Sequence, residues 1–168
     1  MPDRNIGVTT GGVSVNEVVG SSGSGLRLIV VLRVADGTER SFSMPYPSWA
    51  GGPNMTAAAV YRGVDPTAPV DTSATALMAW TYTAQTPPLT STRDGARMVA
   101  FAQSSNSGTT HQWSAPMTAR ATVCCAVTSV ADRAVAAGAT GQSTVSFSAV
   151  TSVALVALVL RPADTGTT

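Results

Sequence analysis

Alternating apolar and polar residues recur along this chain and give its first structural signal. Within residues 26–34, Leu26, Leu28, Val30, Leu32 and Val34 would share one face of an extended segment. Side chains of a β-strand point alternately to its two sides. The pattern therefore predicts a strand over residues 26–34 with a strongly apolar face. The same alternation predicts that Val145 and Phe147 point inward from a strand over residues 143–148.

Other segments are apolar without interruption, which is typical of strands covered on both faces. We expect such strands at residues 55–62, 96–102 and 152–160. Residues 72–83 alternate loosely, residues 117–130 form a long apolar stretch with threonines, and residues 132–137 predict a short strand or, less favoured, a helical turn. Glycines and prolines separate these segments, and no helical period is present. The fold class predicted is all-β, an antiparallel, jelly-roll-like β-sandwich of about 8–10 strands.

The first 25 residues differ from the rest, because they are rich in Gly, Ser and Thr. Only residues 13–19 look strand-like there, with Val13 and Val15 as the apolar positions. We therefore predict a flexible N-terminal arm with one weak strand at 1–25, a β-sandwich domain at 26–162 and a polar tail at 163–168.

The low charge and the lengths of the apolar runs argue against nucleic-acid-binding and membrane-spanning proteins. Charged residues make up 11% of the 168 residues and the net charge is +1, so nucleic acid is not an expected partner. The longest apolar run, residues 153–160, is too short to span a bilayer, and no signal peptide opens the chain, so synthesis in a host cytoplasm is expected. All ten basic residues are arginine; a GC-rich genome accounts for this, and selection for bidentate pairing at interfaces is the weaker alternative.

Residues able to carry catalysis are sparse. We place the single histidine, His111, at a polar strand start near the loop of residues 104–110, and interpret it as a surface residue in a loop and not as a catalytic base. Cys124 and Cys125 are interpreted as small apolar residues within a strand. The acidic residues fall mostly at predicted turns, namely Asp36, Asp65, Asp71, Asp94 and Asp132. A calcium site at Asp65 and Asp71 is a weaker alternative, since the dense ligand pattern of a calcium loop is missing. We predict no enzymatic activity, no cofactor and no metal.

Three tryptophans stand out among few aromatic residues. Trp49, Trp80 and Trp113, with Tyr82, are candidates for a platform on which a sugar ring stacks. The favoured interpretation is that they serve as core residues and interface anchors.

The segment Tyr-Arg-Gly-Val-Asp-Pro-Thr-Ala-Pro-Val-Asp at residues 61–71 predicts a structured corner between strands. Gly63 is expected to adopt a backbone shape that other residues resist, and Asp65 to accept local N–H groups, with Pro66 and Asp71 completing the corner. This segment resembles a β-sandwich domain of actinobacterial tailed-phage virion proteins. Softer similarity extends over residues 26–162. The members of that family carry one or two more strands before the equivalent of Leu28, so an open sheet edge is expected here, covered by the arm or by a neighbouring molecule.

The resemblance implies a non-enzymatic protein of a phage virion surface. The expected role is a capsid decoration (minor capsid) protein that binds and stabilises the shell; the alternatives are a minor tail protein or a glycan-binding module that attaches the particle to the host cell wall. The implied partners are other copies of the chain and major capsid or tail proteins, with cell-wall glycan as the alternative, and no nucleic acid or membrane. Localisation in the virion follows from the same resemblance.

Overall fold

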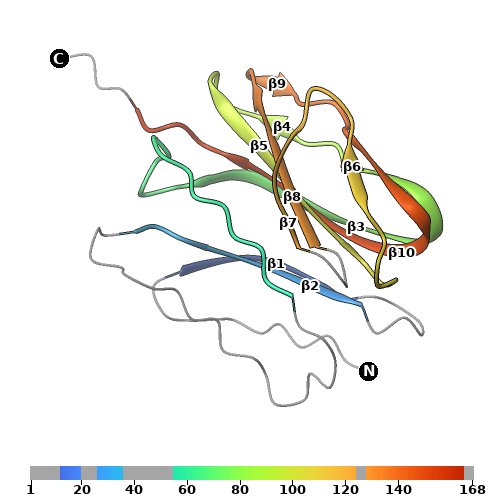
Figure 1. Ribbon diagram of the computed structural model, residues 1–168. Helices are drawn as coiled ribbons and strands as arrows, with labels where there is room; N and C mark the ends of the chain where they lie inside the picture. Colours follow the sequence, from blue (N-terminus) through green and yellow to red (C-terminus); the bar gives the residue numbers. More distant parts are fainter. Residues whose placement is uncertain (1–11, 20–25, 36–54, 124–127, 165–168) are drawn as a thin grey trace.

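The computed structural model describes residues 12–19, 26–35, 55–123 and 128–164 (Figure 1). These residues form an all-β fold, as predicted, with antiparallel pairing throughout and no helix within the described ranges. The ten strands are β1 Gly12–Val19, β2 Arg27–Arg33, β3 Val70–Gln85, β4 Thr90–Ser91, β5 Ala96–Ser104, β6 His111–Trp113, β7 Thr118–Val123, β8 Thr128–Val135, β9 Gly138–Ala139 and β10 Thr144–Leu160.

The largest sheet has the order β3-β10-β5-β8-β7, and β6 pairs with the first part of β10. Two small sheets, β1-β2 and β4-β9, complete the described part of the chain. Strand β10 is the centre of the fold because its residues 153–160 pair with β3 on one side and with β5 on the other. No helix in the described ranges is long and apolar enough to cross a membrane.

The continuous apolar run in β10 is explained by burial on both faces. Successive residues of this strand enter two different clusters, so that Leu155 and Val159 belong to one and Val156 and Leu158 to the other. All four are at most 2% exposed. The prediction of a strand covered on both sides at residues 152–160 is therefore confirmed, although this strand is continuous with the one predicted at residues 143–148.

The first cluster, here called the inner core, lies inside a bend of the β3-β10 ladder (Figure 1). At the bend the two strands differ in length, because residues 147–150 of β10 correspond to the single residue Tyr82 of β3. The extra residues let the first part of β10 fold back over the sheet. This brings Val145 and Phe147 together with Met98 and Leu155. Val145 and Phe147 are 0% and 6% exposed, which confirms their predicted inward orientation.

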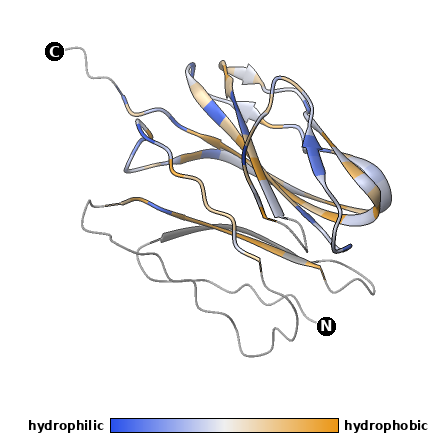
Figure 2. Cartoon of the chain, in the orientation of Figure 1, coloured by the Kyte–Doolittle hydropathy of each residue, from blue (hydrophilic) through white to orange (hydrophobic). Residues whose placement is uncertain are grey.

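The second cluster, here called the outer core, lies between the main sheet and the β1-β2 pair. Leu26, Leu28 and Val30 pack here against Val99 and Val156. Figure 2 shows apolar residues along β2 and along the strands that it covers. The two core layers on opposite faces of one central sheet give the sandwich-like architecture.

Strand β1 pairs with β2 along its whole length, from Gly12 opposite Arg33 to Val19 opposite Arg27. Val13 lies opposite Leu32, and Val15 lies at the irregularity between Ser14 and Asn16. The N-terminal region thus adds a strand beside β2.

Two details of the strand prediction were wrong. Residues 55–61 are extended but belong to no strand; Ala57, Ala59 and Tyr61 face the outer core while Val60 is 90% exposed. A segment without a strand partner buries only the side that lies on the sheet. Residues 117–130 do not form one element either, because β7 and β8 pair antiparallel with Val123 opposite Thr128.

Candidate functional site

The main polar feature of the fold is a group of four side chains, here called the Asp132 cluster: Tyr61, Arg97, Arg120 and Asp132. The Asp132 carboxylate, only 1% exposed, accepts hydrogen bonds from all the others. Arg120 donates through Nε (2.7 Å) and Nη2 (3.0 Å), Arg97 through Nη1 (2.6 Å), and the Tyr61 hydroxyl at 2.9 Å. A buried carboxylate is stable only with such partners.

The sheet register explains how these residues meet. Asp132 on β8 lies opposite Val99 on β5, so its side chain is on the outer-core face, and Arg97 is on the same face two residues earlier. In β7, Ala119 lies opposite Ala131 and Ala121 opposite Val130, so Arg120 is the extra residue of a bulge. Bulges commonly redirect a side chain. Here the arrangement lets Ala121 pack in the outer core while Arg120 reaches Asp132.

The electrostatics of the cluster follow from these bonds. Burial alone would raise the pKa of Asp132, but the hydrogen bonds from Arg120, Tyr61 and Arg97 outweigh it and hold the pKa below its ordinary value. Burial and the hydrogen bond to Asp132 raise the pKa of Tyr61 well above its ordinary value, so its hydroxyl remains a donor. The cluster therefore keeps the Asp132 carboxylate charged and the Tyr61 hydroxyl protonated near neutral pH.

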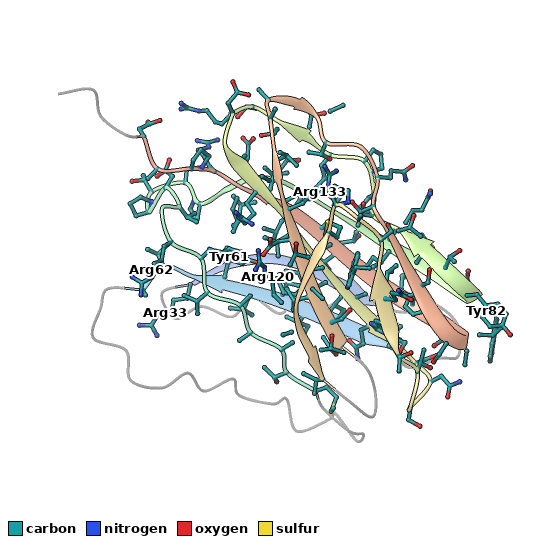
Figure 3. All side chains as sticks on the ribbon, turned by 45° about the horizontal axis from the view of Figure 1, so that its top comes forward. Arg33, Tyr61, Arg62, Tyr82, Arg120 and Arg133 are labelled. Atoms are coloured by element: carbon teal, nitrogen blue, oxygen red, sulfur yellow. The ribbon has the colours of Figure 1, made fainter. Side chains whose placement is uncertain are left out.

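A pocket of about 460 Å³ opens beside this cluster. Residues 58–62 form one wall, and Arg97, Arg120 and Asp132 form the other. Figure 3 shows Arg120 next to Tyr61, whereas the exposed side chain of Arg62 lies apart from them, on the side of Arg33. Among the described residues, no carboxylate pairs with Arg62. The guanidinium groups of Arg97 and Arg120 thus lie beside the pocket together with the Asp132 carboxylate.

The corner at residues 61–71 is tied to the end of β10. Gly63 has a φ of 71°, in the left-handed region that glycine favours. The Asp65 carboxylate accepts the backbone N–H groups of Thr67 (2.8 Å) and Ala68 (3.2 Å), which lower its pKa, and Pro66 lies within the turn so closed. Two backbone bonds of 2.9 Å, from Asp65 to Arg161 and from Ala163 to Gly63, join the corner to the chain after β10.

Asp71 forms the second anchor of the corner. Its carboxylate, 1% exposed, accepts bonds from the Thr92 backbone and hydroxyl (both 2.6 Å) and from Arg161 Nη2 (3.2 Å). Burial alone would raise the pKa of Asp71, but these bonds outweigh it and lower the pKa. Asp65 and Asp71 therefore hold different parts of the backbone. The described residues contain no group of three or more His, Cys, Asp or Glu able to hold a metal ion.

His111 lies at a strand start, as predicted, but the interpretation as a surface residue in a loop was wrong, because the side chain is partly buried. It begins β6, and its ring contacts Ser129 Oγ through Nδ1 (2.8 Å) and Ser104 Oγ through Nε2 (3.1 Å). The ring also meets the edge of Phe147 at a centroid distance of 4.9 Å. Burial lowers the pKa of His111 to about 4, so the imidazole is neutral at neutral pH. The ring thus holds β6 against β5 and β8.

The tryptophans have different surroundings. Trp113 is 9% exposed in the inner core and donates from Nε1 to Ser129 Oγ (3.0 Å). Trp80 is 77% exposed on the edge strand β3, where its φ of 48° is unusual for a bulky residue. Leu77 and Tyr82 on the same strand are 42% and 59% exposed. We call Leu77, Trp80 and Tyr82 the β3 surface. Trp49 lies outside the described residues.

The remaining sequence candidates are placed as follows. Asp94 accepts the backbone N–H of Ala137 (2.9 Å). Asp132 lies within β8, so the prediction that placed it at a turn was wrong. Cys124, Cys125 and Asp36 fall outside the described residues, and nothing is described of the side chains of Val13 and Val15.

The sequence analysis missed the Asp132 cluster. One signal for it exists: Asp132 and Arg133 interrupt the apolar residues 130–135, and a charge within a buried strand needs a partner. The pattern does not identify that partner. In comparisons with protein-family models, curated proteins and solved structures, nothing matches the chain.

Proposed function

We propose that this chain is a non-enzymatic structural protein of a phage virion surface, which acts as a capsid decoration protein. The corner at residues 61–71, with its resemblance to virion β-sandwich domains, supports this assignment. The sandwich-like fold is compatible with this role, although a fold alone does not define a function.

The β3 surface is the observation that carries the proposal. Large hydrophobic side chains that lie together on a protein surface mark docking sites, and tryptophan, tyrosine and arginine are enriched among the residues that contribute most to interface binding energy. Trp80 is 77% exposed at a β3 bulge, where two residues, Ala79 and Trp80, lie opposite one residue of β10. Its positive φ is a local strain. An exposed indole on a strained backbone does not stabilise the folded chain, so contact with a partner explains the position of Trp80 better than a role in folding does.

The polar clusters support a structural role as well. The Asp132 carboxylate is occupied by Tyr61, Arg97 and Arg120, and both ring nitrogens of His111 contact serine hydroxyls. These groups join separate strands to one another. In the proposed mechanism, many copies each bury the β3 surface on the shell, and the summed binding energy raises the cost of opening it.

The exposure of Trp80 also supports an alternative function. An exposed indole can stack on a sugar ring, so a glycan-binding module that attaches the particle to the host cell wall is the second candidate. A minor tail protein is compatible with either kind of contact.

Immunogold labelling of intact virions with an antibody to this chain tests the location. Regularly spaced label on the capsid is the expected result. Label confined to the tail supports the tail alternative, and virions free of the protein contradict the proposal.

Trp80→Gly tests the surface itself. Glycine removes the indole and relieves the positive φ, so we expect unchanged or higher thermal stability together with weakened binding to shells that lack the protein. Gln85→Ala, at an exposed position on the same strand, is the matched control and should bind normally. If Trp80→Gly binds shells as well as the unaltered chain does, the β3 surface is not the docking site. If the unaltered chain binds cell-wall glycan saturably and the variant does not, the glycan-binding alternative is favoured.

A further inference from the structure

Strand β3 forms one edge of the main sheet and carries little protection against pairing with another strand. It stands at one end of the strand order, and among the described residues it pairs only with β10. Exposed edges of natural sheets are commonly short or carry charges, prolines or bulges, which prevent association. In contrast, β3 has 16 residues, and residues 72–85 contain no charged residue, glycine or proline.

The opposite edge of the same sheet is protected. Strand β7 has only 6 residues and carries the charged side chain of Arg120 at the bulge between Ala119 and Ala121. Short length, charge and a bulge are the features that discourage pairing between edges. The contrast indicates that β3, and not β7, is the edge suited to accept a strand from another molecule.

The burial of β3 shows which part of its edge is accessible. Residues 70–74 are all partly buried, whereas Thr75, Leu77 and Ala79 are exposed. These three alternate along the strand, so their side chains lie on one face of the sheet. The accessible part of the edge therefore begins at Thr75.

The bulge at Trp80 marks the other end of the accessible part. Beyond it, the Thr81 hydroxyl donates to the backbone oxygen of Thr83 (2.6 Å), and the backbone N–H of Thr83 donates to the same hydroxyl (3.1 Å). Backbone groups that are bonded within their own strand are less available to a neighbour. Residues 75–79 are thus the stretch best able to pair.

A second copy of the chain fits this stretch. Two identical strands related by a two-fold axis pair antiparallel, so each contact occurs twice. With the axis at Leu77, this residue lies opposite Leu77 of the second copy, and Ala76 lies opposite Met78. Ala76 and Met78 both pack against the inner core, so pairing joins residues of the same face. The 42% exposed Leu77 becomes covered by its own copy, and no charges meet.

We propose that this chain forms a two-fold homodimer by antiparallel pairing of β3 with β3 of a second copy, centred on Leu77. Main-chain hydrogen bonds join the two main sheets into one, and the cross-strand leucine pair fixes the register. The β3 surfaces of both copies then lie on the same face of the joined sheet. The proposal does not depend on the virion assignment, because the dimer forms without a shell.

Sedimentation equilibrium of the full chain over a wide range of concentrations tests the proposal. We expect a reversible equilibrium between monomer and dimer. Leu77→Lys places two ammonium groups opposite each other, and like charges in that position oppose pairing, so the dissociation constant of the dimer should rise about tenfold or more. A chain that is monomeric at every concentration would overturn the proposal.

Val60→Lys is the matched control, because it adds the same charge at a residue that is 90% exposed and lies outside β3. Its dissociation constant should stay within about twofold of that of the unaltered chain. A mixture of Leu77→Lys and Leu77→Glu tests the register, since the opposite charges meet only when the two positions face each other. The mixture should dimerise more tightly than either variant alone. Unchanged dimerisation of Leu77→Lys, or a mixture that pairs no better than its components, would contradict pairing at Leu77.

Discussion

Gly63 imposes the strictest backbone requirement in the corner. Its φ is 71°, and a Cβ added there would meet no atom within 4 Å, so strain alone should determine the effect of a substitution. We expect Gly63→Val to lower the free energy of unfolding by about 1–3 kcal/mol. Gly63→Asn should cost clearly less, because asparagine tolerates the left-handed region. Urea denaturation of both variants measures the difference, and equal stabilities would contradict the assigned backbone strain.

His111 should make the stability depend on pH. Its pKa is about 4 in the folded protein and near 6.5 when unfolded, so the folded state favours the neutral ring. The contribution of neutral His111 to the free energy of unfolding is therefore fully present above about pH 6.5. It is lost as the pH drops toward 4, and the loss amounts to about 2 kcal/mol after allowance for the ring's partial exposure.

Thermal melts between pH 7 and pH 4 test the His111 prediction. In His111→Gln the drop over this range should shrink, whereas losses below about pH 4 should persist because Asp71 and Asp132 have lowered pKa values. An unaltered profile in the variant would show that His111 is not the group responsible.

Asp132 is the third residue with a distinct prediction. Asp132→Asn leaves Arg97 and Arg120 without their carboxylate at the edge of the outer core, and we expect a loss of about 2–4 kcal/mol. Tyr61→Phe removes only one of the bonds and should cost about 1–2 kcal/mol. Denaturant unfolding of the two variants checks the order of these effects; a larger loss in Tyr61→Phe would be inconsistent with the central role of Asp132.

The contrast between Asp65 and Asp132 shows which residue roles a sequence can reveal. Asp65 bonds to groups two and three residues away, so the local pattern was enough to predict its interactions. Asp132 bonds to residues that are 12, 35 and 71 positions away. Only the pairing of β5, β7 and β8 brings these residues together, and the sequence does not encode that register in any local pattern.

Among the strands, central elements were easier to predict than edge elements. Strands β5 and β10 are apolar without interruption because both of their faces are buried, and such a run can be recognised from residue types alone. The expected alternation in β3 fails at Trp80, because the bulge there turns its side chain outward while Ala76 and Met78 still pack on the inner core. Bulge positions depend on the partner strand, which is why the sequence pattern did not indicate this one.

The difference between central and edge strands can be measured on two neighbouring leucines. Leu155 in β10 is fully buried in the inner core, and Leu77 in β3 is 42% exposed. We expect Leu155→Ala to cost about 2–5 kcal/mol and Leu77→Ala less than about 1 kcal/mol. Chemical denaturation provides the comparison; similar costs would mean that β3 contributes as much core packing as β10.

At the scale of the whole molecule, one bent ladder organises both cores. Strand β10 pairs with β6 through residues 145–147 and with β5 through residues 153–160, and so supplies side chains to the inner core from two directions. Composition and turn signals were enough to predict an antiparallel sandwich. The bend was not predictable, since residues 143–160 were interpreted as two strands.

The N-terminal strand provides the final prediction. Deleting residues 1–20 removes β1 and leaves β2 as an unpaired edge above the outer core, next to Leu28 and Val30. An unpaired edge loses its main-chain hydrogen bonds and is a site for non-native association. We expect this truncation to lower the melting temperature and to weaken oligomerisation or particle binding. Deletion of residues 1–11, which retains β1, is the control for strand pairing and should preserve thermal stability. If the longer truncation melts, assembles and binds like the full chain, β1 has neither a structural nor an assembly role.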